Sequence, residues 1–192
     1  MLESAARLFS RKGYAATTVR EIVAAVGVSK PVLYYYFGSK EGIYLELMRG
    51  PFEKLDRLLL DFRRAEGSAV GKLLDLCDRV YALFCENMEA ARIMHSIYYG
   101  PPQGAPFFDF DMHHAKFRDA VRGLVGEGMK NEELKTLDAD DVTWAVIGAL
   151  NVAVAVRLTN PEVAFDRGGL NRILKIILSG AAAFCPKEGE TC

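Results

Sequence analysis

The fold of this chain follows from residues 17–41, which read TTVREIVAAVGVSKPVLYYYFGSKE. Thr18, with Glu21 three positions later, forms the capping-box pattern of a helix start, and Gly27 is the residue type that most often follows a helix end. Ser29 is a favoured capping residue at the start of the next apolar run. The segment therefore predicts two short helices joined by a tight turn, which is the core of a helix-turn-helix.

The outward face of the second of these helices is aromatic and apolar. At 3.6 residues per turn, Leu33 and Phe37 fall on one side and face the core, whereas tyrosines, Pro31 and Val32 point outward and Lys30 lies at the start. A solvated helix seldom exposes such a face. Such a face suits a helix that lies in the major groove of DNA. There the tyrosine hydroxyls can bind phosphates, the apolar groups can contact thymine methyls, and the lysine can bind guanine or phosphate. DNA binding is thus predicted; the alternative is an ordinary three-helix packing unit with a few exposed tyrosines.

Helical periodicity continues through the rest of the 192-residue chain, and no segment alternates in the manner of a β-strand. Hydrophobic residues make up 51% and charged residues 26% of the chain, which is enough for a sizeable core. The chain is predicted to be all-α with about nine helices: a three-helix DNA-binding domain in residues 1–46 and a helical effector-binding and dimerisation domain in residues 47–192. Beyond the first three helices, others are expected near residues 40–64, with a kink at Gly50–Pro51, and near 68–88, 90–99, 108–129, 138–156 and 170–181.

Charge is distributed unevenly along the chain, although its net charge is only -1. The first 50 residues hold seven lysines and arginines and four glutamates, a net of +3, so the remaining 142 residues carry -4. A basic segment on an acidic body suits local binding to a polyanion. No uncharged apolar run reaches about 18 residues and no signal peptide is found, which predicts a cytoplasmic protein without a membrane partner. The four cysteines are expected to be reduced thiols.

The N-terminal motifs closely resemble those of the TetR/AcrR family of bacterial transcriptional regulators over about residues 2–48. They are Phe9-x-x-Lys-Gly-Tyr14, Thr17-Thr-Val-Arg-Glu-Ile22, Gly27-Val-Ser29 and Leu33-Tyr-Tyr-Tyr-Phe37-Gly-Ser-Lys-Glu41. The resemblance implies a homodimer on a palindromic double-stranded DNA operator, acting as a repressor that a small-molecule effector releases. Lys40 also stands in the first turn of a helix whose positive end can face a phosphate. The resemblance and the helix geometry together give these DNA-binding residues: Thr18, Arg20, Ser29, Lys30, Pro31, Val32, Tyr34, Tyr35, Tyr36 and Lys40.

A helix without charged residues from Val142 to Val156 is expected to be buried on all sides. In a chain of this size a second subunit is the expected cover, and small residues permit close contact. The resemblance points to the same last two helices; the alternative is a well-buried core helix of a monomer. The predicted dimer-interface residues are Val142, Ala145, Gly148, Ala149, Ala153, Ile173, Leu174, Ile177, Leu178 and Ala181.

Large side chains of the middle helices are candidates to line a pocket for a small apolar or aromatic effector. Tyrosine, tryptophan and histidine add polar ends to such a pocket, and methionine adapts to irregular shapes. Each of these residues could equally belong to ordinary core. The candidates are Phe62, Tyr81, Phe84, Met88, Met94, Tyr98, Phe110, His113, Phe117 and Trp144.

No constellation of residues predicts catalysis, and we expect neither enzyme activity, nor a metal, nor a cofactor. The run Asp109-Phe-Asp-Met-His-His114 collects two acids and two histidines, but on a helix Asp109 shares a face with His113 and Asp111 with Ala115, so the four groups do not converge. Two alternatives to a ligand-responsive regulator stay open on the sequence. One is a constitutive DNA-binding or architectural protein without a ligand, and the other is a small helical enzyme that uses the 109–114 region.

Overall fold

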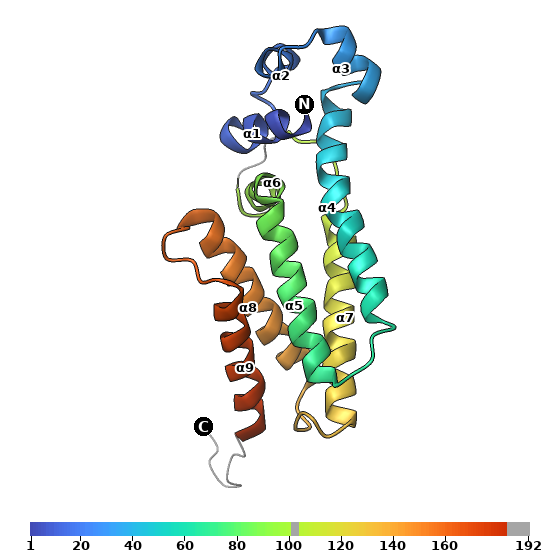
Figure 1. Ribbon diagram of the computed structural model, residues 1–192, viewed down its shortest axis with the longest axis vertical. Coiled ribbons are helices and arrows are strands. Elements are labelled where there is room, and N and C mark those ends of the chain that lie inside the picture. Colours follow the sequence, from blue (N-terminus) through green and yellow to red (C-terminus); the bar gives the residue numbers. More distant parts are fainter. Residues whose placement is uncertain (101–103, 184–192) are drawn as a thin grey trace. The chain divides into compact units, whose positions relative to one another are not determined.

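The computed structural model describes residues 1–100 and 104–183, and within them the chain forms nine α-helices and no strand (Figure 1). The prediction of an all-α chain is confirmed. Cys77 and Cys85 are free thiols, while Cys185 and Cys192 lie outside the described residues. The helices are α1 (Leu2–Lys12), α2 (Val19–Val26), α3 (Lys30–Phe37), α4 (Lys40–Phe62), α5 (Ala69–Glu86), α6 (Met88–Tyr99), α7 (Phe110–Lys130), α8 (Ala139–Thr159) and α9 (Arg167–Ala183).

The ends of α2 and α3 follow the local signals in the sequence. The Thr18 hydroxyl accepts from the Glu21 backbone N–H at 3.2 Å, and the Glu21 carboxylate accepts from the Thr18 N–H at 2.8 Å, so the capping box is complete. Gly27 closes α2 in the left-handed conformation, with φ +73°. Gly38 ends α3 at φ +69°, where a side chain would be strained. The turn geometry of the helix-turn-helix is therefore set by residues within a few positions of each other.

The expected kink at Gly50–Pro51 does not divide α4, which runs as one helix from Lys40 to Phe62. Proline has no backbone N–H to donate, so one turn of α4 lacks a hydrogen bond without losing its helical course. The fourth helix therefore leads directly from the helix-turn-helix into the rest of the chain.

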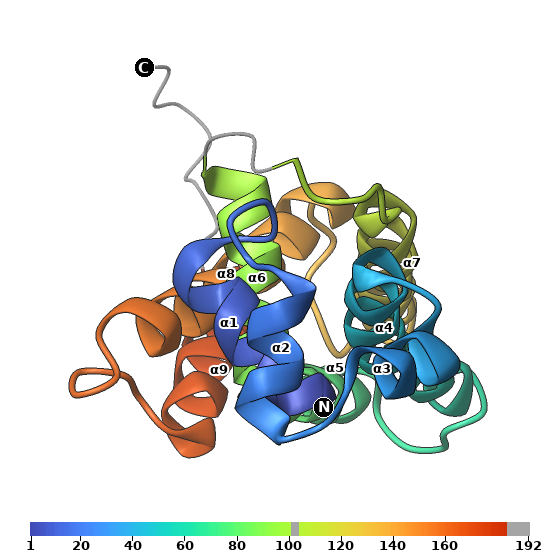
Figure 2. The same cartoon turned by 90° about the horizontal axis from the view of Figure 1, so that it is seen from above.

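The chain forms two compact units, each built from two stretches of the sequence. Unit 1 contains residues 1–57 and 83–113, and unit 2 contains residues 58–82 and the chain from 114 onward. In unit 1, α1 packs against α6, as Figure 1 and, from above, Figure 2 show. The core of unit 1 is built on Phe9, Ile22, Leu33, Ile43, Tyr44 and Met48, and that of unit 2 on Leu73, Leu76, Val80, Val121, Leu150, Leu170 and Leu174.

Helix α8 packs along α9 within unit 2 (Figure 1). Among the described residues, α8 is the one helix whose length and mean hydropathy would allow it to cross a membrane, a property it shares with core helices of soluble proteins. Asp140 and Asp141 occupy its first turn and Arg157 its last turn. Trp144 and Val152 are each 58% exposed in the single chain, so the chain itself does not cover α8 on all sides.

Candidate nucleic-acid interface

Helix α3 has a buried inner side and an aromatic outer side. Leu33 is fully buried, whereas Tyr35 is 83% exposed and Tyr34 and Tyr36 are exposed beside it. The rings of Tyr35 and Tyr36 meet edge-on, with centroids 5.1 Å apart. The inner contact fixes the rotation of the helix about its axis, so that the tyrosines are held on the solvent side.

The first turn of α3 presents a hydroxyl, an ammonium group and two apolar side chains to solvent. Ser29, Lys30, Pro31 and Val32 are all exposed. The Ser29 side chain makes no capping hydrogen bond to α3, in contrast to the expectation from its residue type. These four side chains lie at the N-terminal end of the second helix, which is the end that contacts base edges in known helix-turn-helix complexes.

Helix α2 contributes one residue with a structural role and one exposed cation. The Thr18 hydroxyl both donates to and accepts from Glu21, at 2.8 and 3.2 Å, which accounts for its capping function. Arg20 is exposed. A hydrogen bond from Lys12, followed by bonds from the Thr18 backbone and hydroxyl, lowers the pKa of Glu21 to about 2. The carboxylate beside the proposed DNA face is therefore already paired with a cation.

Lys40 is half-buried, and its ammonium group points into the protein. Its Nζ donates to the backbone carbonyls of Tyr14 and Thr17, each at 2.9 Å. The same nitrogen lies 4.1 Å from the centroid of the Tyr14 ring. Of the ten residues predicted to bind DNA, nine are exposed on α2, on α3, in the turn between them or at the cap of α2, and Lys40 is the exception.

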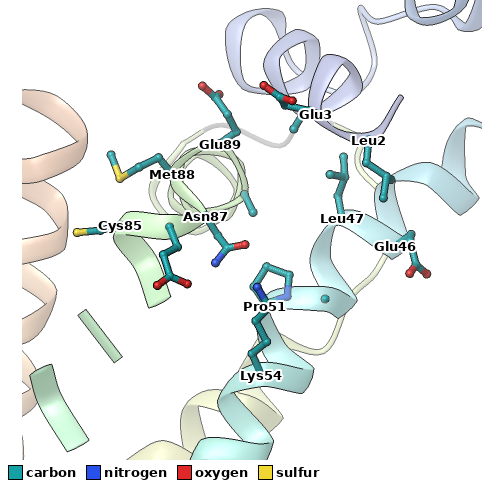
Figure 3. Close-up of a pocket in the computed structure, with 14 residues that line it drawn as sticks. Leu2, Glu3, Glu46, Leu47, Pro51, Lys54, Cys85, Asn87, Met88 and Glu89 are labelled. Carbon is teal, nitrogen blue, oxygen red and sulfur yellow. The ribbon is translucent and has the colours of Figure 1, made fainter. Parts of the chain in front are cut away.

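Unit 1 contains a cavity of about 470 Å³ between α1, α4 and the junction of α5 with α6 (Figure 3). Figure 3 shows Glu3 and Glu89 on one side of it and Pro51 and Lys54 on the other. Of the ten residues predicted to line an effector pocket, only Met88 lines this cavity. Four glutamates, but only one lysine, contribute to its wall, so the cavity is more acidic than the expected apolar pocket.

Three of the effector candidates do come together in unit 1, with two rings that the sequence did not single out. The Phe110 ring lies 6.1 Å from that of Tyr98 and 5.6 Å from that of Phe52, which in turn contacts His113. Phe108 stacks on His113 with centroids 5.7 Å apart, and Phe52 lies 4.5 Å from His113. The cluster combines the His113 imidazole and the Tyr98 phenol with the three phenyl rings of Phe52, Phe108 and Phe110.

The other effector candidates have varied surroundings. Phe84 and Met94 are half-buried in unit 1, and Phe62 and Phe117 are buried in unit 2. Tyr81 is buried in unit 2, where its hydroxyl donates to the Phe165 carbonyl at 3.0 Å. Trp144 is exposed on α8. These six side chains therefore do not share one type of environment.

The predicted dimer-interface residues fall into two groups. Ala145 and Gly148 are exposed, and Ala149, Ile173 and Ile177 are half-buried. Four members are already buried within the single chain: Val142, Ala153, Leu174 and Leu178. The side chain of Ala181 lies outside the described residues. Val152 and Trp144 of α8 and Ile176 of α9 are further exposed apolar side chains of these two helices, the last being 71% exposed.

The polar groups of residues 109–114 have separate partners. The Asp109 carboxylate accepts from the Met112 N–H at 2.9 Å, and the Asp111 carboxylate accepts from the Tyr98 hydroxyl. His113 Nδ1 lies 3.3 Å from an Asp56 carboxylate oxygen. Within residues 1–100 and 104–183, no three histidine, cysteine or acidic side chains gather as metal ligands do.

These features define a helix-turn-helix DNA-binding protein. The family model for "Bacterial regulatory proteins, tetR family" matches residues 1–47. The HTH-type transcriptional repressor KstR2 of Rhodococcus jostii is 30% identical over 200 residues, which cover 95% of this chain and 90% of the relative. The chain therefore belongs to the tetR family of bacterial regulatory proteins, and the prediction of this family is confirmed.

Two further relatives show how far the similarity extends. KstR2 of Mycobacterium tuberculosis is 36% identical over 96 residues, which are 50% of this chain but only 44% of that relative. The crystal structure of PfmR from Thermus thermophilus, a TetR family transcriptional regulator, superposes with a TM-score of 0.75 at 24% identity. That superposition covers 93% of this chain and 96% of the other, so the fold is shared over nearly the whole length.

Proposed function

We propose that this chain is a sequence-specific transcriptional repressor that binds an operator in double-stranded DNA by placing α3 in the major groove. The observation that carries the proposal is the outer side of α3, where Lys30, Val32 and Tyr35 are exposed while Leu33 anchors the helix. Lys30 provides contact with guanine or phosphate, and the apolar groups provide contact with thymine methyls. Residues 1–46 form the DNA-reading part, and residues 47–192 carry effector binding and dimerisation.

Homodimerisation through α8 and α9 gives each operator two recognition helices. Trp144, Val152 and Ile176 form an exposed apolar surface on these helices, and Ala145 and Gly148 on α8 leave room for close approach of a second helix. A second copy of the chain would cover this surface symmetrically. The operator is then a palindrome whose half-sites are about one helical turn, roughly 34 Å, or a multiple of it apart.

A small apolar or aromatic effector releases the repressor in this scheme. The aromatic cluster around Phe110 and His113 supports the proposal, because it offers stacking surfaces with one polar ring. An effector that binds better to the dimer with mis-spaced recognition helices weakens operator binding, and by linkage the operator weakens effector binding equally. We place this activity in the cytoplasm.

Selection of bound fragments from genomic DNA, followed by a stoichiometry measurement on the selected fragment, tests the proposal. We expect enrichment of a palindrome that binds two chains, with an affinity that falls steeply as salt rises. Binding without sequence preference would instead identify a constitutive architectural protein. Absence of DNA binding at low salt would overturn the proposal.

A further inference from the structure

Helix α3 holds few of the side chains that distinguish bases by hydrogen bonds. It reads KPVLYYYF from Lys30 to Phe37, without arginine, asparagine, glutamine or an acidic residue. In the major groove, arginine and lysine bind guanine, asparagine and glutamine bind adenine, and acidic side chains accept from cytosine. Of this set α3 has only Lys30, and its tyrosines add single hydroxyl groups. Beyond these groups, base reading by α3 depends on apolar contacts.

Two apolar side chains stand next to each other in the first turn of α3. Pro31 is exposed and Val32 is 37% exposed, whereas the next residue, Leu33, is fully buried. The side chains of Pro31 and Val32 carry neither a donor nor an acceptor, and the proline nitrogen has no hydrogen to donate. These two residues form the apolar pair of α3, at the end of the helix that contacts base edges in known helix-turn-helix complexes.

The apolar feature that a pyrimidine presents in the major groove is a methyl group at C5. Thymine has this methyl group beside its O4 acceptor, whereas cytosine has an N4 amino donor and only a hydrogen at C5. The apolar pair gains free energy by covering a methyl group, but it makes no hydrogen bond to O4 or to the amino group. Contact with the apolar pair therefore favours a pyrimidine with a C5-methyl group over the same pyrimidine without one.

We propose that Pro31 and Val32 recognise the C5-methyl group of a pyrimidine, whether it belongs to thymine or to 5-methylcytosine. The inference rests on the proposed binding of α3 in the major groove, and it names the chemical group that the helix reads there. Its consequence is a form of regulation, because methylation of a cytosine at that position strengthens operator binding. One covered methyl group is worth about a fourfold change in affinity.

Deoxyuridine removes the methyl group of thymine without changing base pairing, so it tests the proposal directly. The affinity of the wild type is measured for the selected operator and for versions in which each thymine in turn is replaced by deoxyuridine. We expect the affinity to fall about fourfold at one or more positions in a half-site. At such a position, a cytosine·guanine pair is then compared with a 5-methylcytosine·guanine pair. The methylated form should bind about fourfold more tightly.

The double variant Pro31→Ser/Val32→Ser removes the apolar pair and tests whether it is responsible. Serine has a helix propensity close to that of valine, and the changed side chains are exposed. In this variant the affinities for the thymine and deoxyuridine operators should agree at the sensitive positions. Val163→Ser is the matched control, since Val163 is 67% exposed but lies between α8 and α9. The control should keep the full difference between the two operators.

The comparison on the wild-type protein needs no variant, so it decides the proposal even if the double variant does not fold. Val32→Ser alone then takes its place and should reduce the difference between thymine and deoxyuridine. An affinity that deoxyuridine leaves unchanged at every position overturns the proposal, and so does a difference that the variants retain in full. Failure of the wild type to select any operator would instead count against the proposed function on which the inference rests.

Discussion

Tyr44 is fully buried, and its hydroxyl has no hydrogen-bond partner within the part of the chain that the structure describes. Its ring packs edge-on against Phe9 and Tyr14 at centroid distances of 6.3 and 5.3 Å. Burial, and to a smaller extent the nearby Tyr14, raises the pKa of Tyr44 to about 12, so the hydroxyl stays protonated at physiological pH. The buried ring therefore stabilises the core of unit 1, whereas burial of the hydroxyl without a hydrogen bond destabilises the folded state.

We expect Tyr44→Phe to stabilise the protein, because it removes an unsatisfied buried polar group worth about 1–3 kcal/mol and keeps the ring. For a chain of this size, 1 kcal/mol corresponds to a rise in Tm of about 2–4 °C, which thermal unfolding followed by circular dichroism can detect. Tyr81→Phe is the matched control, since the Tyr81 hydroxyl donates to the Phe165 carbonyl at 3.0 Å. That variant should lower the Tm. A drop in Tm for both variants would contradict the view that the buried Tyr44 hydroxyl destabilises the protein.

Helix α2 depends on a capping box whose carboxylate is ionised. The Lys12 hydrogen bond, with two bonds from Thr18, lowers the pKa of Glu21 to about 2 from an ordinary value near 4.5. A group whose pKa is lower in the folded state stabilises that state above its unfolded pKa and loses the effect as pH falls toward the folded one. This contribution is therefore complete above about pH 4.5 and disappears toward pH 2.

We expect Glu21→Gln to lower the Tm at pH 7 and to match the wild type near pH 2, with the difference shrinking between these limits. Thermal unfolding of both proteins at several pH values measures it. Thr18→Ser preserves the hydroxyl cap and should unfold close to the wild-type temperature throughout. A Tm difference for Glu21→Gln that stays constant from pH 7 to pH 2 would contradict the role of the charge.

The start of α5 is capped from a residue far away in the sequence. The Glu133 carboxylate accepts from the backbone N–H groups of Ala69 and Val70, at 2.8 and 2.9 Å. We expect Glu133→Ala to cost about 1–2 kcal/mol, as the loss of a helix cap does, measured by urea unfolding. The adjacent Glu132→Ala is the control and should change stability little; equal effects of both changes would show that the cap is not responsible.

These helices show which features the sequence can predict. The capping box of α2, the glycine after it and the outward tyrosines of α3 depend on residues within one or two turns, so local patterns were sufficient. The cap of α5 joins Val70 to Glu133, 63 positions away, and the Lys40 ammonium group donates to the Tyr14 carbonyl, 26 positions away. Such contacts arise from tertiary packing, and neither residue type nor spacing indicates them.

The same limit applies to the effector candidates. The candidates are large side chains of the middle helices, and that property belongs equally to core and to pocket residues. Phe52 and Phe108 join the cluster around His113, although neither was a candidate. Their contribution depends on how segments from α4 and the start of α7 meet in unit 1, which a single sequence does not specify.

At the scale of the whole molecule, the proposed function requires two recognition helices, and hence an interface between copies of the chain. We expect Ile176→Glu to weaken dimerisation at least 100-fold, because it places a charge on the apolar surface formed by α8 and α9. Light scattering across a concentration series measures the dimer dissociation constant. Operator affinity should fall with it, since a monomer reaches only one half-site.

Val163→Glu is the matched control for this change. Val163 is 67% exposed, but it lies between α8 and α9 and not on either helix. The control should leave both the oligomeric state and operator affinity close to those of the wild type. A wild-type chain that is monomeric at all concentrations, or an Ile176→Glu variant that dimerises normally, would contradict the proposed interface.

The central claim is that the outer face of α3 reads DNA sequence. Its most direct test is the affinity of the wild type and of Tyr35→Ala for the selected operator and for a scrambled fragment of equal length, at one salt concentration. Wild-type preference for the operator should be about a thousandfold or more. Tyr35→Ala should lower that preference by about tenfold, with an unaffected fold because the Tyr35 ring is exposed. Equal affinities of the wild type for the two fragments, or an unchanged preference in Tyr35→Ala, would contradict the claim.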